Sequence, residues 1–290
     1  MNYEIVTDSS SNLAEEYIET NNLHILPLTF IVDDVQYQSY LKGEHTDLKQ
    51  FYTMMRDGKV ITTSLPNLAD SENLFREILT SGKDLIYIGF SSGLSGSYEA
   101  LELILRNLKA EFPERTILSV DTLAASGGQG LLVSLAVEKA QEGLSIQELA
   151  AWVEENKLNI AHWFTVEDLV YLLRGGRVSK TSAWAGTMLN IKPVLHVDDE
   201  GHLIPVEKIR GRKKSLNAMV DRVGASALSP LSEQTMFINH GDCYEDAEYV
   251  MNKIREEYGV KNFVINYIDP VIGAHAGPGV LALFFLAEKR

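Results

Sequence analysis

The amino-acid sequence predicts an α/β fold with two domains. Through residues 1–159, short apolar stretches with strand character alternate with helical stretches, which is typical of a mostly parallel sheet with helices on both faces. After about residue 160, two strand-like stretches are joined by the turn 198–201, which indicates a smaller mixed sheet with helices. The 290 residues suffice for two domains of ordinary size. We therefore expect domains at residues 1–159 and 160–290.

Apolar periodicity and turn residues predict the elements of the first domain. Pro27 indicates an edge or irregular position in the second strand, and 62–67 is expected to be a polar turn before a helix. The predicted strands are 3–8, 24–32, one beginning at 86, and 116–121. The predicted helices are 13–20, 46–58, one ending near 80, 97–108, 126–140 and 145–156.

The second domain is expected to mix strands and helices less regularly. Its predicted strands are 161–166, 190–197, 203–209, 235–239, 262–268 and 280–286. Its predicted helices are 167–173, 180–189, 214–225 and 245–258. The glycine-rich stretch 273–279 is expected to be a loop.

The stretch 86–98 combines a strand, a turn rich in serine and glycine, and a helix that begins near Ser97. Unpaired N–H groups and the dipole of a helix start make such a turn a candidate anion site. Because no Lys or Arg lies between Lys83 and Arg106, the turn suits one carboxylate better than a polyphosphate. The alternative is that Ser95 or Ser97 only caps the helix.

Asp8, Thr63 and Ser95 each follow an expected strand or precede an expected helix. Ligands of parallel sheets bind at the carboxyl ends of the strands, so these residues are candidates for one crevice. For Asp8 itself we favour a structural role in its turn. His275 lies among small residues that leave its ring room to reach a ligand, and a structural histidine is the alternative.

Motifs for nucleotide chemistry are missing from the sequence. It has neither a Walker-type lysine loop nor a Gly-x-Gly-x-x-Gly after the first strand. The stretch 93–97 is similar to a hydrolase nucleophile elbow but lacks the final glycine, so a serine hydrolase that uses Ser95 is a minor alternative. The histidines have no metal-ligand spacing, and we expect neither a metal nor a cofactor.

The charge is strongly negative overall and unevenly distributed. The net charge of −14 argues against nucleic-acid binding. Residues 174–214 carry nine Lys or Arg against four Asp or Glu, a balance of +5, so the remainder carries −19. This basic stretch is either a docking face for an acidic partner or anionic membrane, or an ordinary solvated surface. The single cysteine, Cys243, and the lack of a signal-peptide pattern favour the cytoplasm.

Six motifs in this order resemble those of the DegV family of bacterial fatty-acid-binding proteins. This family includes the acyl-carrying subunits of bacterial fatty acid kinase. The resemblance extends from Asp8 to the last expected strand, which is essentially the whole chain. The motifs are Thr7-Asp8-Ser9-Ser10, Thr63-Ser64-Leu65-Pro66, Ser91 to Ser97, Arg174-Gly175-Gly176-Arg177, Asn190-Ile191-Lys192-Pro193-Val194 and Gly273-Ala274-His275-Ala276-Gly277.

The resemblance implies two α/β domains of DegV type, with a long acyl chain buried between or within them. It implies that Thr63, Ser95 and His275 bind the fatty-acid carboxylate, although Leu65 stands where a glutamine is usual. Arg177 and Arg210 are implied to dock to the kinase subunit. On that assignment, replacing Arg177 should leave acyl binding unchanged.

The implied role is that of a carrier, not of an enzyme. The protein would take a fatty acid from the membrane during a transient contact and present its carboxyl group to a separate fatty acid kinase. The acyl phosphate would then enter phospholipid synthesis. The alternatives are a freestanding enzyme that uses Ser95 as nucleophile or Asp8 for phosphotransfer, and a carrier of another small lipid carboxylate.

Overall fold

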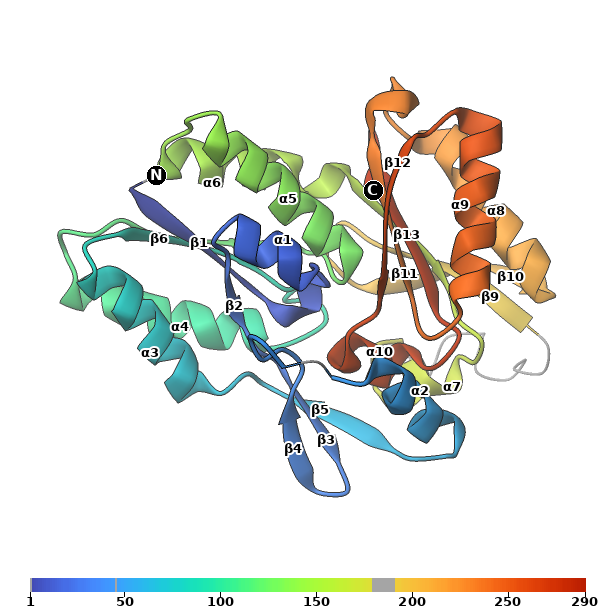
Figure 1. Cartoon of the computed structure of the whole chain (residues 1–290), viewed down its shortest axis with the longest axis horizontal. Helices are drawn as coiled ribbons and strands as arrows, with labels where there is room; N and C mark the ends of the chain where they lie inside the picture. Colours follow the sequence, from blue (N-terminus) through green and yellow to red (C-terminus); the bar gives the residue numbers. More distant parts are fainter. Residues whose placement is uncertain (1, 45, 179–190) are drawn as a thin grey trace.

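Two β-sheets with helices on their faces form the framework of the molecule (Figure 1). The structure is a computed structural model and describes residues 2–44, 46–178 and 191–290. One sheet is parallel and the other is mixed, which confirms the expected α/β fold. The helix predicted at 180–189 lies outside the described residues.

The first sheet consists of four parallel strands in the order β2 (His24–Leu26), β1 (Tyr3–Asp8), β6 (Asp84–Gly89) and β7 (Ile117–Asp121). Helices α3 (Leu68–Thr80) and α4 (Ser97–Glu111) pack on one face. Helices α5 (Gly127–Gln141) and α6 (Ile146–Asn156) pack on the other (Figure 1). Both faces are apolar, and the double layer of helices removes them from water.

The second sheet has six strands in the order β10 (Leu203–Arg210), β9 (Ile191–Val197), β8 (Ile160–Thr165), β13 (Leu281–Leu286), β11 (Thr235–His240) and β12 (Asn262–Tyr267). β11 and β12 are parallel, and the other neighbours are antiparallel. Helices α8 (Arg212–Ser226) and α9 (Tyr244–Tyr258) cover one face, and α5 contacts the other. The expectation of a smaller second sheet was wrong, because the six strands that were predicted in this half join in one sheet, whereas the parallel sheet has four.

A third, antiparallel sheet was not expected from the sequence. It consists of β4 (Val35–Gln38), β3 (Thr29–Val32) and β5 (Ile61–Ser64). The predicted strand 24–32 divides at Pro27, which has no N–H for a ladder, and the chain leaves the first sheet for the third there. A polar turn was expected at 62–67, but residues 62–64 belong to β5, in which half-buried Thr63 alternates with exposed Thr62 and Ser64.

Helix α10 (Pro270–Ala276) occupies part of the stretch that was expected to be a glycine-rich loop. That expectation was wrong, because Asp269 accepts hydrogen bonds from the first turn and Pro270 suits the first helical position. Helix α2 (Leu48–Arg56) packs on α10, where Gly273 leaves room for the ring of Tyr52. The Tyr52 hydroxyl donates a hydrogen bond to the carbonyl oxygen of Ile268 at 2.9 Å.

None of the helices in the described part of the chain has the length and apolar character needed to cross a bilayer. The division at residues 159 and 160 stays a prediction, since α5 of the first segment also packs on strands of the second. The remaining helices are α1 (Glu15–Thr20), α7 (Val170–Arg174) and the 3-10 helices η1 (Ser9–Ser11), η2 (Lys157–Asn159) and η3 (Leu231–Glu233).

Asp8 is a fully buried carboxylate at the end of β1, and its contacts are structural. It accepts hydrogen bonds from the backbone N–H of Ser10 at 3.2 Å, from the hydroxyl of Tyr87 at 2.9 Å and from the N–H of Phe90 at 2.9 Å. Burial raises the pKa of this carboxyl group, and the hydrogen bonds from Ser10, Phe90 and Tyr87 oppose that shift. Asp8 thereby fixes the start of the turn that leads to Ser95.

We expect Asp8→Ala to lower the free energy of unfolding by about 3 kcal/mol, because it leaves several buried donors without an acceptor. Urea denaturation measures this change. The matched control is Asp57→Ala at an exposed position just after α2, with an expected change within about 0.5 kcal/mol. Equal effects of the two substitutions would contradict a structural role for Asp8.

Candidate functional site

An apolar cavity of about 290 Å³ lies where the two halves of the chain meet. This volume is near the lower end of the roughly 300–1,000 Å³ that small-molecule sites occupy. The cavity is lined mainly by apolar side chains from both halves, among them Leu28, Phe90, Phe164, Leu203 and Phe284. Such a wall favours an aliphatic or aromatic ligand over a strongly hydrated one.

Thr63 and His275 meet in the wall of this cavity. The hydroxyl oxygen of Thr63 lies 2.8 Å from Nε2 of His275, so that β5 is joined to α10 by a hydrogen bond. These residues are 212 positions apart in sequence. They come together because α2, directly before β5, packs against α10 through Phe51 and Tyr52. The packing of α2 on α10 therefore explains why Thr63 lies next to His275.

Ser95 lines the same cavity, in the turn between β6 and α4. Its hydroxyl oxygen accepts a hydrogen bond from the N–H of Ser97 at 3.2 Å and lies 2.8 Å from the Ser97 hydroxyl. Ser95 therefore satisfies a donor of the helix start and also lines the cavity. Asp8, the third residue expected in this crevice, is not among the lining residues.

The turn after α7 brings Gly175 and Arg177 against the same site. A Cβ atom at position 175 would lie only 2.2 Å from Nδ1 of His275, so a glycine is required for the ring to take this place. Arg177 lines the cavity and is half-buried. It donates hydrogen bonds from Nε to the carbonyl oxygen of Leu94 at 3.1 Å and from Nη1 to that of Gly175 at 2.6 Å. The Arg177 side chain therefore connects the Ser95 turn to the segment that contacts His275.

The imidazole of His275 is neutral at physiological pH. Burial, together with the smaller effect of the positive charges of Arg177 and Arg174, lowers its pKa to about 4. A neutral imidazole offers one N–H donor, so Thr63, Ser95 and His275 form a set of uncharged hydrogen-bonding groups. Such groups suit a single carboxylate in a largely apolar cavity.

Two lining residues, Arg177 and His162, were not predicted from the sequence to lie at this site. His162 is 1% exposed, its Nδ1 lies 2.8 Å from the carbonyl oxygen of Ile160, and burial lowers its pKa well below the usual value. The period of two along β8, which sends His162 and Phe164 to the same side, is the signal that could have revealed it. No comparable signal places Arg177, because its position depends on contacts with two backbone carbonyl groups, one of which is 83 residues away.

Arg210, the other residue expected at a docking face, lies elsewhere. It is exposed at the end of β10 and does not line the cavity. Lys213 and Lys214, exposed at the start of α8, add to the positive charge of this surface.

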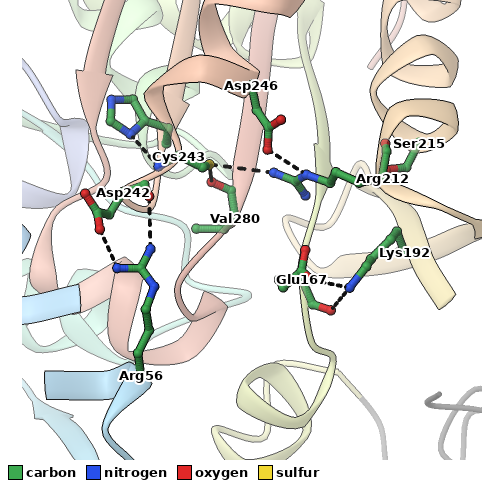
Figure 2. Close-up of polar contacts among 10 residues, drawn as sticks. Arg56, Glu167, Lys192, Arg212, Ser215, Asp242, Cys243, Asp246 and Val280 are labelled. Carbon is green, nitrogen blue, oxygen red and sulfur yellow. Dashed lines mark hydrogen bonds and ion pairs between the residues drawn. The ribbon is translucent and has the colours of Figure 1, made fainter. Parts of the chain in front are cut away.

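Two ion pairs connect segments that are distant in sequence (Figure 2). Arg56 at the end of α2 pairs with the carboxylate of Asp242 and donates to its carbonyl oxygen at 2.9 Å. Lys192 of β9 pairs with Glu167, just before α7.

Burial raises the pKa of the Cys243 thiol to about 12, which makes it a poor nucleophile. Within residues 2–44, 46–178 and 191–290, no three His, Cys, Asp or Glu side chains gather as metal ligands.

A family model described as "Uncharacterised protein, DegV family" matches residues 2–288. The chain belongs to the DegV family. A DegV domain-containing protein of Clostridium perfringens is 41% identical over 286 residues, which are 99% of this chain and 98% of the relative. The cavity and its polar groups are therefore those of a DegV protein.

Solved structures of other DegV proteins have the same fold. The crystal structure of DegV from Bacillus subtilis, described as a fatty acid binding protein, is 28% identical with a TM-score of 0.84 and covers 99% of this chain and 100% of its own. A DegV family protein from Thermus thermophilus, whose structure is described as showing fatty acid binding, is 27% identical with a TM-score of 0.86. This match covers 99% of the present chain and 100% of the other.

We expect the His275 ring of this DegV protein to titrate near pH 4 when its proton signal is followed by NMR. The signal is assigned by its loss in His275→Gln. Since the unfolded chain takes up this proton first, the contribution of the neutral buried ring to stability is complete above pH 6.5 and is lost as the pH falls toward 4. The free energy of unfolding should fall by about 3 kcal/mol over this pH range, and by less in His275→Gln, which has no titrating ring at this position. A titration near pH 6.5 would contradict the burial of the ring.

Proposed function

We propose that this protein binds a long-chain fatty acid in the cavity, with the carboxylate hydrogen-bonded by Thr63, Ser95 and His275. The observation that carries the proposal is the convergence of these three neutral groups, from distant segments, on one largely apolar cavity. Each buried methylene of an acyl chain contributes about 0.8 kcal/mol. The buried carboxylate must be hydrogen-bonded, or its desolvation would cancel that gain.

Relatives support the same ligand class. The DegV proteins of Bacillus subtilis and Thermus thermophilus are described as binding fatty acids, and each is aligned over nearly the whole of this chain. On this basis the ligand of the present cavity is a single-chain carboxylic acid. Its chain length depends on how far the acyl chain extends between the two halves of the protein.

The geometry favours a carrier over a freestanding enzyme. The Ser95 hydroxyl is hydrogen-bonded to Ser97 and the His275 ring to Thr63, so no histidine is paired with Ser95 in the described part of the chain. A serine nucleophile needs such a base. Asp8, the candidate for phosphotransfer, is fully buried in a structural network outside the cavity lining.

We further propose that the protein takes the fatty acid from a membrane surface in the cytoplasm and presents it to a separate fatty acid kinase subunit. The acyl phosphate would supply phospholipid synthesis. Arg210 supports this proposal because it lies exposed on a basic surface with Lys213 and Lys214, whereas the chain as a whole carries a net charge of −14. Arg177, the second proposed docking residue, exposes only part of its side chain.

We expect organic extracts of the purified protein to contain one fatty acid per chain by mass spectrometry. Ser95→Ala and Thr63→Ala should each lower affinity for added fatty acid by about tenfold or more, because each removes a hydrogen bond to a charged group. The matched control is Ser92→Ala, in the same turn but outside the cavity lining, with unchanged affinity. A protein without lipid, whose esterase activity is lost in Ser95→Ala, would establish the enzyme alternative instead.

We expect Arg210→Ala to leave fatty-acid affinity unchanged and to lower acyl phosphate formation with the kinase by about tenfold, because docking of charged surfaces is lost. A coupled assay with the purified kinase subunit and ATP measures this rate. The control is Lys261→Ala, an exposed cation just before β12. A docking role for Arg210 is wrong if both substitutions have the same effect, or if acyl binding falls in parallel with phosphorylation.

A further inference from the structure

The guanidinium of Arg290 connects the two halves of the chain. A guanidinium has five N–H donors, and that of Arg290 donates hydrogen bonds to five backbone carbonyl oxygens. Three of these acceptors precede residue 160 and two do not, so the side chain joins both sides of the predicted boundary. The acceptors are the carbonyl oxygens of Thr122 at 3.4 Å, Leu123, Lys157 at 2.8 Å, Ile160 at 3.3 Å and Asp198 at 3.2 Å.

Arg290 is half-buried and keeps its charge. Burial lowers its pKa to about 10, and the carboxylates of Asp199, Asp198 and Asp121 oppose this shift. The guanidinium is therefore protonated at neutral pH, and its bonds to the carbonyl oxygens are charge-assisted. Such hydrogen bonds are about twice as strong as neutral ones.

The contacts at Thr122 and Leu123 hold a strained part of the cavity wall. In the connection between β7 and α5, Leu123 and Ser126 have positive φ angles of 51° and 55°. Residues other than glycine rarely adopt this region, and they stay there only where their surroundings hold them. The same connection contributes Ala125 and Ser126 to the cavity lining. The position of this wall therefore depends on the contacts of Arg290.

The contact at Asp198 holds the turn between β9 and β10 against the first half of the chain. Val197 and Leu203, on either side of that turn, line the cavity. The hydroxyl of Ser91 adds a hydrogen bond to the carbonyl oxygen of Gly201 at 3.0 Å. A Cβ atom at position 201 would lie 2.2 Å from Oγ of Ser91, so the glycine permits this close approach. Two contacts between the halves thus meet at one turn.

A ligand enclosed by residues of both halves can exchange only through a transient opening between them. Contacts that cross between the halves determine how often this opening forms. Arg290 touches wall segments of both halves and is not itself a lining residue of the cavity. It can therefore control exchange without contacting the ligand.

We propose that Arg290 is a positioning residue that holds the two halves closed around the cavity and limits the rate of ligand exchange. This inference rests on the proposed fatty-acid binding and adds to it the contact that controls entry and release. Loss of the contact raises the population of the opened state. Association and dissociation then accelerate by the same factor, and Kd does not change while the closed state predominates.

Stopped-flow fluorescence with cis-parinaric acid, a fluorescent fatty acid, measures both rates on the full-length protein stripped of lipid. Arg290→Met should accelerate association and dissociation by about tenfold each, with Kd unchanged. Ser91→Ala, which removes the other contact to the turn, should accelerate both by a smaller factor. Arg290→Lys, which keeps the charge with fewer donors, should lie between Arg290→Met and the wild type. The matched control is Lys289→Met, at an exposed neighbouring position, with wild-type rates.

Each other outcome has a definite meaning. Weaker binding by Arg290→Met without faster association would show that the side chain only stabilises the fold, and would overturn the inference. Wild-type rates in Arg290→Met would overturn it as well. If that variant does not fold, Ser91→Ala and Arg290→Lys decide, and wild-type rates in both overturn the inference.

Hydrogen exchange separates this inference from the proposed function. Failure of the wild-type protein to bind the probe would refute the proposed fatty-acid binding. The contact between the halves is then judged by amide exchange in Arg290→Met, which should be faster than in the wild type at 122–126 and 198–201. Equal protection of these residues in the two proteins would overturn the inference.

Discussion

The hydrogen bond between Thr63 and His275 joins the two halves of the chain at the polar part of an otherwise apolar cavity. It requires that β5 and α10 be held side by side, which the packing of α2 on α10 achieves. It also requires that the His275 ring be uncharged and closely surrounded, for which Gly175 provides the space. The small third sheet, the short helix α10 and the glycine turn after α7 all contribute to this one contact.

The electrostatics of the cavity follow from the same burial. Most of the described residues that line it are neutral, and the full charge among them is that of Arg177, in the segment between β8 and β9. A carboxylate can be transferred out of such a site more readily than out of one with several cations, because fewer strong contacts have to be broken. The proposed carrier function needs this balance between binding and release.

Helix α5 links the framework to the site. It packs on the first sheet with α6 and contacts β8, β11 and β13 of the second sheet, so the two sheets share one layer of helix. Residues directly before its first turn, Ala125 and Ser126, line the cavity. The relative placement of the two sheets, and with it the width of the cavity, therefore depends on how α5 packs between them.

The sequence by itself determined the α/β fold, most helices and strands, and the candidates Thr63, Ser95 and His275, because periodicity and motifs are local properties of a chain. Local signals did not reveal the third sheet or the helix around His275, since Pro27 and Asp269 act through partners chosen during folding. Only the tertiary structure placed Arg177 in the cavity wall. Its position is set by hydrogen bonds to two carbonyl groups, 83 and 2 residues away, and such bonds leave no pattern in a sequence.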